Sequence, residues 1–247
     1  MMDGTPLFNS VAPLRNVGAL VELMDRVQRR GHGLPGMATF YGPSGYGKTT
    51  AAIYAANRFA AYQVQVKSTW TARKLCTAIL QDLAMPPART IADMVDQISE
   101  EIAKSGRPLI IDEADHLVSH KVIEIVRDIY ESSGAAIILI GEELLPQKLQ
   151  KWERVHGRML DWVGAEPGDL ADVGHLARIY CPGVELDEEM KKLILKESKA
   201  SIRKISVNLD RVREIARTKG VKSVSRADWG KAGFFTGHAP APRRFPS

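Results

Sequence analysis

The fold of this chain is decided by residues 37–50, which read MATFYGPSGYGKTT. Residues 37–41 form a short apolar run that predicts a buried strand, and residues 48–59 continue as an alanine-rich run typical of a helix. Between them, residues 42–49 follow the pattern G-x-x-x-x-G-K-[ST]. A glycine-rich loop that leads into a helix directs backbone N–H groups and the positive end of the helix dipole toward one point. The stretch therefore predicts a phosphate-binding P-loop.

Each position of this loop has a part in binding ATP. The glycines let the backbone wrap closely around phosphate oxygens, Lys48 reaches the β- and γ-phosphates, and Thr49 binds Mg²⁺. A glycine-rich turn that matches the pattern by chance is the alternative, and the flanking strand and helix disfavour it. The residues expected to bind the nucleotide are Gly42, Pro43, Ser44, Gly45, Tyr46, Gly47, Lys48, Thr49 and Thr50.

A pair of carboxylates supplies the second half of the predicted site. Asp112 and Glu113 follow residues 108–111, which are apolar without alternation, as in a strand that is covered on both faces. We expect Asp112 to hold Mg²⁺ together with Thr49, and Glu113 to orient and polarise the attacking water. Acidic residues can also end a strand simply by reaching solvent. The P-loop upstream favours the catalytic interpretation.

Strand-like and helix-like runs alternate over residues 19–165, which predicts an α/β domain with a parallel sheet flanked by helices. The expected strands cover residues 37–41, 62–66, 108–111, 135–140 and 159–163. The expected helices cover residues 19–30, 48–59, 71–83, 91–103, 118–129 and 143–152.

The pattern changes near residues 165–168, beyond which only helical periodicity continues. We expect helices over residues 170–180, 187–197, 201–217 and 226–231. The predicted organisation is an N-terminal arm (1–18), the α/β ATPase domain (19–165), a small all-helical lid (166–235) and a basic, proline-rich tail (236–247).

Composition narrows the class of protein. No apolar run approaches the roughly 20 residues that span a bilayer, and the first residues do not resemble a signal peptide. We therefore expect a cytoplasmic protein without a membrane partner. The two cysteines, Cys76 and Cys181, form no C-x-x-C pair, which disfavours a zinc site. The net charge of +5 is compatible with a polyanionic partner without requiring one.

Glu142 follows the predicted strand at residues 135–140, where it would face the γ-phosphate. A carboxylate there is electrostatically unfavourable unless a cation pairs with it. Either Glu142 points away or hydrolysis is slow. The alternative is an acidic residue that merely begins the next helix.

Arginines provide candidates for completing the site. Arg158, and after it Arg154, lie between a predicted helix and the last strand, where ring-forming ATPases present an arginine to the nucleotide of the neighbouring subunit. A surface arginine in a basic segment is the alternative. In the lid, Arg203 could reach the γ-phosphate of its own subunit, and Lys204 or Arg211 could exchange roles with it.

Cations, hydroxyls and one aromatic residue cluster after the predicted second strand, a combination that suits phosphate contacts with nucleic acid. A solvated helix start is the alternative for any single residue. The candidate DNA-binding residues are Lys67, Thr69, Trp70, Arg73 and Lys74, with Lys104 and Lys121 as an extension.

Residues 112–115 spell D-E-A-D, the box of a helicase family whose members carry two recombinase-like domains. Residues 166–247 are too few, and too helical in pattern, for a second parallel-sheet domain of roughly 100–200 residues. We reject the helicase interpretation.

Together, the P-loop, the run at 109–113, the strand end at 137–143, the Arg154 and Arg158 segment and the helical lid resemble an AAA+ ATPase. Within that superfamily the chain is similar to the DNA-transposition ATPases, such as the B protein of transposable phages like Mu and the ATPase subunits of bacterial transposons. Residues 41–49, 112–117 and 152–158 carry this narrower resemblance. Residues 1–18 are too short for the helix-turn-helix domain of the Mu protein.

This resemblance implies an ATPase that uses Mg²⁺, assembles as a homo-oligomeric filament or ring on duplex DNA without strong sequence preference, and recruits a transposase. Its hydrolysis would be slow and stimulated by the partner. A different class stays open at this point, namely a cytosolic AAA+ switch that acts on protein partners without DNA.

Overall fold

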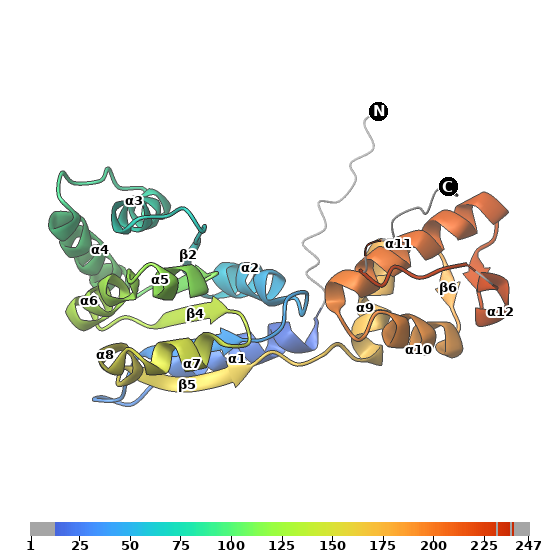
Figure 1. Ribbon diagram of the computed structural model, residues 1–247, viewed down its shortest axis with the longest axis horizontal. Coiled ribbons are helices and arrows are strands. Elements are labelled where there is room, and N and C mark those ends of the chain that lie inside the picture. The colour runs from blue at the N-terminus through green and yellow to red at the C-terminus, as the bar shows by residue number, and fades with distance from the viewer. Residues whose placement is uncertain (1–12, 231, 238, 240–247) are drawn as a thin grey trace, which may run out of the picture. The chain divides into compact units, whose positions relative to one another are not determined.

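The computed structural model describes residues 13–230, 232–237 and 239. The chain folds into two compact units, with a boundary in the sequence between Glu166 and Pro167 (Figure 1). The first unit is Arg15–Glu166, and the second contains the other described residues. The expected arm and tail lie largely outside the described residues. None of the described helices combines the length and apolarity that a membrane crossing requires.

A five-stranded sheet with the order β2-β3-β4-β1-β5 forms the centre of the first unit. All of its pairings are parallel, so the carboxyl ends of the strands share one edge. The strands are β1 (Met37–Tyr41), β2 (Tyr62–Gln65), β3 (Leu109–Asp112), β4 (Ile137–Gly141) and β5 (Met159–Gly164). The predicted α/β architecture with a parallel sheet is confirmed.

Helices cover both faces of this sheet. Helices α1 (Arg15–Gln28) and α2 (Lys48–Phe59) pack against each other and on the strands. The remaining helices are α3 (Ala72–Asp82), α4 (Ile91–Ser105), α5 (Asp115–Ser119), α6 (Ile123–Ser133), α7 (Leu145–Gln150) and α8 (Glu153–His156).

The residues of the three central strands, β3, β4 and β1, are almost all buried on both sides, as their unbroken apolar runs predict. Ile137 and Leu139 join one large core cluster with residues of the helices from α3 to α8. Phe40 and Ile138 lie outside that cluster and are equally buried. The central strands are therefore held by apolar contact from both layers, which makes the carboxyl edge a rigid platform.

Two predicted helices are wrong in their extent. The run at 118–129 is divided into α5 and α6, because Lys121 adopts a left-handed φ of 58° and the Val122 N–H closes the turn on the Leu117 carbonyl at 2.8 Å. The run at 143–152 contains only α7, and α8 begins separately at Glu153. An apolar stripe continues across such breaks because both helices cover the same core.

The second unit is mainly helical but also contains a short parallel strand pair, which corrects the all-helical expectation. Its residues Glu185–Leu186 pair with Ser223–Val224. Two residues are too few to show a strand periodicity in sequence. The elements are α9 (Leu170–Tyr180), β6 (Glu185–Leu186), α10 (Glu188–Glu197), α11 (Ile202–Lys219), β7 (Ser223–Val224) and α12 (Arg226–Trp229).

Helix α1 begins at Arg15, four residues before the expected start, and brings a buried amide with it. Asn16 is 3% exposed. Its Nδ2 donates to the carbonyls of Tyr46 and Glu166, both at 2.8 Å, and its Oδ1 accepts from the Glu166 N–H at 2.9 Å. One side chain therefore ties the loop after β1 to the segment after β5.

Replacing Asn16 with Ala is expected to lower the free energy of unfolding by about 2 kcal/mol, because backbone groups of Tyr46 and Glu166 lose their hydrogen bonds to a buried side chain. Denaturant unfolding measures this. The matched control is Asn57→Ala in α2, where the exposed amide only reaches back to Ile53. Equal effects of the two substitutions would contradict the role given to Asn16.

Candidate nucleotide-binding site

The loop between β1 and α2 has the backbone that its glycines permit. Gly45 and Gly47 have φ values of 87° and 82°, in the left-handed region that disfavours other residues. At Gly42, φ is 155° and an added Cβ would lie 3.1 Å from the Cβ of Ala165. Helix α2 starts at Lys48, directly after this loop, so its positive end faces the loop.

Lys48 is held inside the loop. Its Nζ donates to the carbonyls of Gly42 at 2.6 Å and Pro43 at 2.9 Å. Burial lowers the pKa of the Lys48 ammonium, and the carboxylates of Glu113 and Asp112 oppose that shift. The lysine is thus a partly desolvated cation whose hydrogen-bond partners among the described residues are neutral carbonyls, an arrangement that suits an incoming phosphate.

Thr49 in the first turn of α2 and Asp112 at the end of β3 are hydrogen-bonded to each other, although they are 63 residues apart in sequence. The Thr49 hydroxyl donates to Asp112 Oδ2 at 3.0 Å, and the Glu113 N–H donates to Asp112 Oδ1 at 2.9 Å. Asp112 is 2% exposed, and its burial raises the pKa of the carboxyl group, while both hydrogen bonds lower it. A hydroxyl and a carboxylate are hard oxygen ligands of the kind Mg²⁺ takes together with phosphates and water.

Glu113 adopts an uncommon backbone conformation, with a φ of 58°. Such strain in a residue other than glycine concentrates at functional sites. Burial raises the pKa of the Glu113 carboxyl group, and the neighbouring charge of Asp112 adds to the effect. The shift makes Glu113 a better proton acceptor than an exposed glutamate.

The corner after β4 lies beside the same lysine. Glu142 is exposed there, and its negative charge acts on Lys48 together with the charges of Asp112, Glu113 and Asp115. Asp115 was not predicted as a site residue. It is buried and accepts a hydrogen bond from the Glu142 N–H. Its only sequence signal was the D-E-A-D box, which pointed to a different class of enzyme.

Arg158 lies at the opposite edge of the sheet from the P-loop. Its carbonyl accepts from the N–H of Met37, the first residue of β1, whereas Gly42 follows the last. The five residues of β1 span roughly 17 Å, which is beyond the reach of an arginine side chain. The Arg158 guanidinium forms an ion pair with Glu131 of α6. Arg154 lies nearby in α8, exposed and without an ion pair to the described residues.

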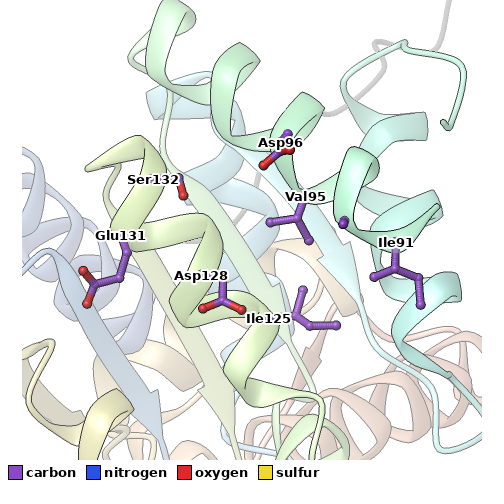
Figure 2. A pocket seen from close by; sticks show the side chains of 8 residues that line it. Ile91, Val95, Asp96, Ile125, Asp128, Glu131 and Ser132 are labelled. Carbon is purple, nitrogen blue, oxygen red and sulfur yellow. The ribbon is translucent and has the colours of Figure 1, made fainter. Parts of the chain in front are cut away.

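Glu131 also lines a groove between α4 and α6 with a volume of about 450 Å³ (Figure 2). Apolar side chains and three carboxylates line it, and no residue comes from the P-loop or the strand ends. It is therefore separate from the predicted nucleotide site. The lining residues are Ile91, Ala92, Val95, Asp96, Ile125, Asp128, Glu131 and Ser132.

The remaining nucleotide candidate, Arg203, lies in the first turn of α11 in the second unit. Thr50 lies in the first turn of α2, within the first unit. The assignments of both residues as nucleotide contacts stay predictions.

The predicted DNA-binding residues divide into two groups. Lys67 and Thr69 are exposed in the loop after β2, at the carboxyl edge, and the ring of His120 is hydrogen-bonded to the Ser68 carbonyl at 2.7 Å. That contact brings Lys121, the next residue in the chain, to the same loop. Sequence reasoning did not assign His120 this role.

The other candidates are less well placed to share one DNA-binding surface with Lys67, Thr69 and Lys121. Trp70 packs partly against the core, with the Lys74 ammonium 5.8 Å from its ring centroid. The guanidinium of Arg73 donates to the Arg89 carbonyl at 2.9 Å. Lys104 is paired with Glu100 in the last turn of α4, which leads into the amino end of β3. The structure therefore separates Lys104 from the loop after β2.

Comparison with known proteins agrees with this geometry. The family model described as AAA domain matches residues 31–149. A search of curated proteins gives no match.

Three solved structures share the fold at low sequence identity. The ORC1 protein of Aeropyrum pernix in complex with DNA has a TM-score of 0.58 and 18% identity over 86% of this chain and 62% of that chain. The ORC2 protein of Aeropyrum pernix in its ADP form has a TM-score of 0.65 and 17% identity over 88% of this chain and 68% of that chain. Cdc6p from Pyrobaculum aerophilum has a TM-score of 0.60 and 15% identity over 87% of this chain and 66% of that chain.

The chain thus spans less than two thirds of the first of these proteins. The matched region contains β1, the P-loop, the acidic strand end of β3 and the corner after β4. Residues 31–149 are therefore similar to the AAA domain of P-loop ATPases, and the chain has the AAA+ fold.

Proposed function

We propose that this protein is an AAA+ ATPase that binds and slowly hydrolyses ATP with Mg²⁺ and binds duplex DNA when ATP is bound. One observation carries the catalytic part of the proposal. The Thr49 hydroxyl lies 3.0 Å from Asp112, and the strained, partly buried Glu113 follows directly. This is the arrangement that phosphoryl transfer to water requires.

The parts of this chain would act together in hydrolysis. Lys48 would exchange its carbonyl partners for phosphate oxygens, and the P-loop N–H groups would hold the phosphates in place. Thr49 and Asp112 would hold Mg²⁺, which neutralises charge on the transferring phosphoryl group when bound. Glu113 would accept a proton from the attacking water. Glu142 adds negative charge near Lys48, which supports slow turnover.

A second subunit would supply the missing cation. Arg158 is too far from its own P-loop, so it can act only on the nucleotide of a neighbouring copy. The proposal therefore includes a homo-oligomer, either a ring or a filament. In one subunit the guanidinium is neutralised by Glu131, which would have to release it on assembly.

The DNA part of the proposal is supported by the lysines at the carboxyl edge. Lys67 and Lys121 lie on adjoining loops at the edge of the sheet where the nucleotide is predicted to bind, so bound ATP could bias their placement. One of the similar structures is of a protein in complex with DNA. We keep recruitment of a transposase within the proposal because residues 41–49 and 112–117 resemble the transposition ATPases. The similar solved structures are of other kinds of protein.

Glu113→Gln is expected to abolish measurable hydrolysis, with turnover falling about a hundredfold or more, while the ATP dissociation constant changes little. The substitution removes the proton acceptor and keeps the size of the side chain. Phosphate release and binding of a fluorescent ATP analogue measure the two effects. Normal hydrolysis by the variant would show that Glu113 is not the catalytic carboxylate.

Arg158→Ala is expected to lower turnover about a hundredfold or more at concentrations where the wild type assembles, because the neighbouring nucleotide loses its cation. Glu131→Gln serves as the matched control, since it removes only the partner of the guanidinium and should retain turnover. Turnover is measured against protein concentration. If Arg154→Ala causes the loss and Arg158→Ala does not, Arg154 is the arginine that acts between subunits.

The double variant Lys67→Gln/Lys121→Gln is expected to weaken ATP-dependent binding to non-specific duplex DNA and to reduce the slope of log K against log salt by about 2, one per phosphate contact. Fluorescence anisotropy across a salt series measures this. Lys104→Gln is the matched control at the other edge of the sheet and should leave the slope unchanged.

Absence of ATP-dependent, salt-sensitive DNA binding by the wild type would remove the DNA part of the proposal. A nucleotide switch that acts on protein partners would then be the better description. The hydrolysis result with Glu113→Gln would be unaffected by that outcome.

A further inference from the structure

Asp115 is a buried carboxylate that the proposed chemistry leaves unused. It is 5% exposed, at the start of α5, two residues after Glu113. An ionised carboxylate in such a position must be matched by donors, because desolvation alone would cost several kcal/mol. Its partners therefore indicate what it does.

Each carboxylate oxygen has one strong donor. Oδ2 accepts from the Glu142 N–H at 2.6 Å, and Oδ1 accepts from Lys148 Nζ at 2.6 Å. The Glu142 donor belongs to the corner after β4, and Lys148 belongs to α7. One side chain from the β3 corner thus binds both parts of the β4 corner.

The backbone around these contacts is shaped to admit the carboxylate. A Cβ added to Gly141 would lie 2.3 Å from Asp115 Oδ2 and 2.7 Å from a methyl carbon of Leu145, so only glycine fits. Next to it, the Ala114 N–H donates to the Ile140 carbonyl at 2.9 Å. The two corners are therefore joined by side-chain and main-chain contacts together.

The joined corners carry two acidic groups whose charges act on the P-loop lysine. Glu113 follows β3 and Glu142 follows β4, and both charges act on Lys48. Lys148 offsets the Asp115 charge, and the Glu142 side chain is exposed. The Glu142 N–H is occupied by Asp115 and is not available to a phosphate.

We propose that Asp115, supported by Lys148, is a positioning residue that holds the Gly141–Glu142 corner in register with Glu113, so that the γ-phosphate meets a preassembled site. It does not itself touch the nucleotide. This inference rests on the proposed ATPase function. Without the clamp, the Glu142 carboxylate could approach the γ-phosphate and repel it.

The test compares Asp115→Asn with the wild type in the full-length chain. The amide keeps the shape and one acceptor but loses the charge that Lys148 pairs with. We expect kcat to fall about tenfold. The affinity for a non-hydrolysable ATP analogue should fall about fivefold, while the ADP dissociation constant stays within about twofold, because ADP lacks the γ-phosphate.

Lys148→Met should change the same two quantities in the same direction. The double variant should be no worse than Asp115→Asn alone, as expected for two residues that act as one unit. Lys151→Met is the matched control: Lys151 is exposed directly after α7 and should leave both quantities unchanged.

The ratio of ATP-analogue affinity to ADP affinity decides the outcome. An unchanged ratio in Asp115→Asn overturns the inference. A fall in both affinities to the same extent, together with a lower melting temperature, also overturns it, because a merely structural role would produce that result. If the wild type itself shows no turnover, the proposed hydrolysis fails, and a changed ratio would still support the role of Asp115.

Discussion

Parallel pairing of β3 with β4, and of β4 with β1, is the constraint on which the candidate site depends. In a parallel sheet every strand ends at the same edge, so segments far apart in sequence leave the sheet side by side. The P-loop, the Asp112–Glu113 pair and the Glu142 corner all follow strand ends of this kind. The hydrogen bond between Thr49 and Asp112 is the direct consequence.

Charge balance sets what this edge can do. The charges of Glu113, Asp112, Asp115 and Glu142 act on Lys48, yet within the described part of the chain it donates to two carbonyls. Lys148 neutralises Asp115, which leaves three carboxylates near a position proposed for phosphates. A divalent cation held by Thr49 and Asp112 would offset this repulsion. The proposed dependence on Mg²⁺ and the proposed slow hydrolysis therefore have the same electrostatic origin.

The length of the strands separates Arg158 from the predicted nucleotide site of its own subunit. Arg158 lies at the amino edge, so contact with a phosphate requires another copy of the chain. Within one subunit its guanidinium forms an ion pair with Glu131. Lys67 and Lys121 lie at the carboxyl edge instead. In the proposed function, DNA and nucleotide would therefore lie at the carboxyl edge of one subunit, and the amino edge of its neighbour would bring Arg158 to that nucleotide.

The strands could be predicted to within two residues, because an unbroken apolar run has few alternatives in a covered parallel sheet. Helix extents were less predictable. The apolar stripe from Val118 to Ile129 continues through a turn at Lys121, since both α5 and α6 pack on the same core. Periodicity reports which face is buried, and it does not report where the helix axis changes direction.

By itself, the sequence determined the P-loop, the acidic strand end and the alternation of strands and helices, because these depend on local spacing and on burial along one segment. Only the tertiary structure decided the partners of Asn16 and Asp115, the pairing of Arg158 with Glu131, and the separation of Lys104 from Lys67. Each of these depends on which segments the sheet brings together. A polar side chain carries no mark of its distant partner in its own neighbourhood of sequence.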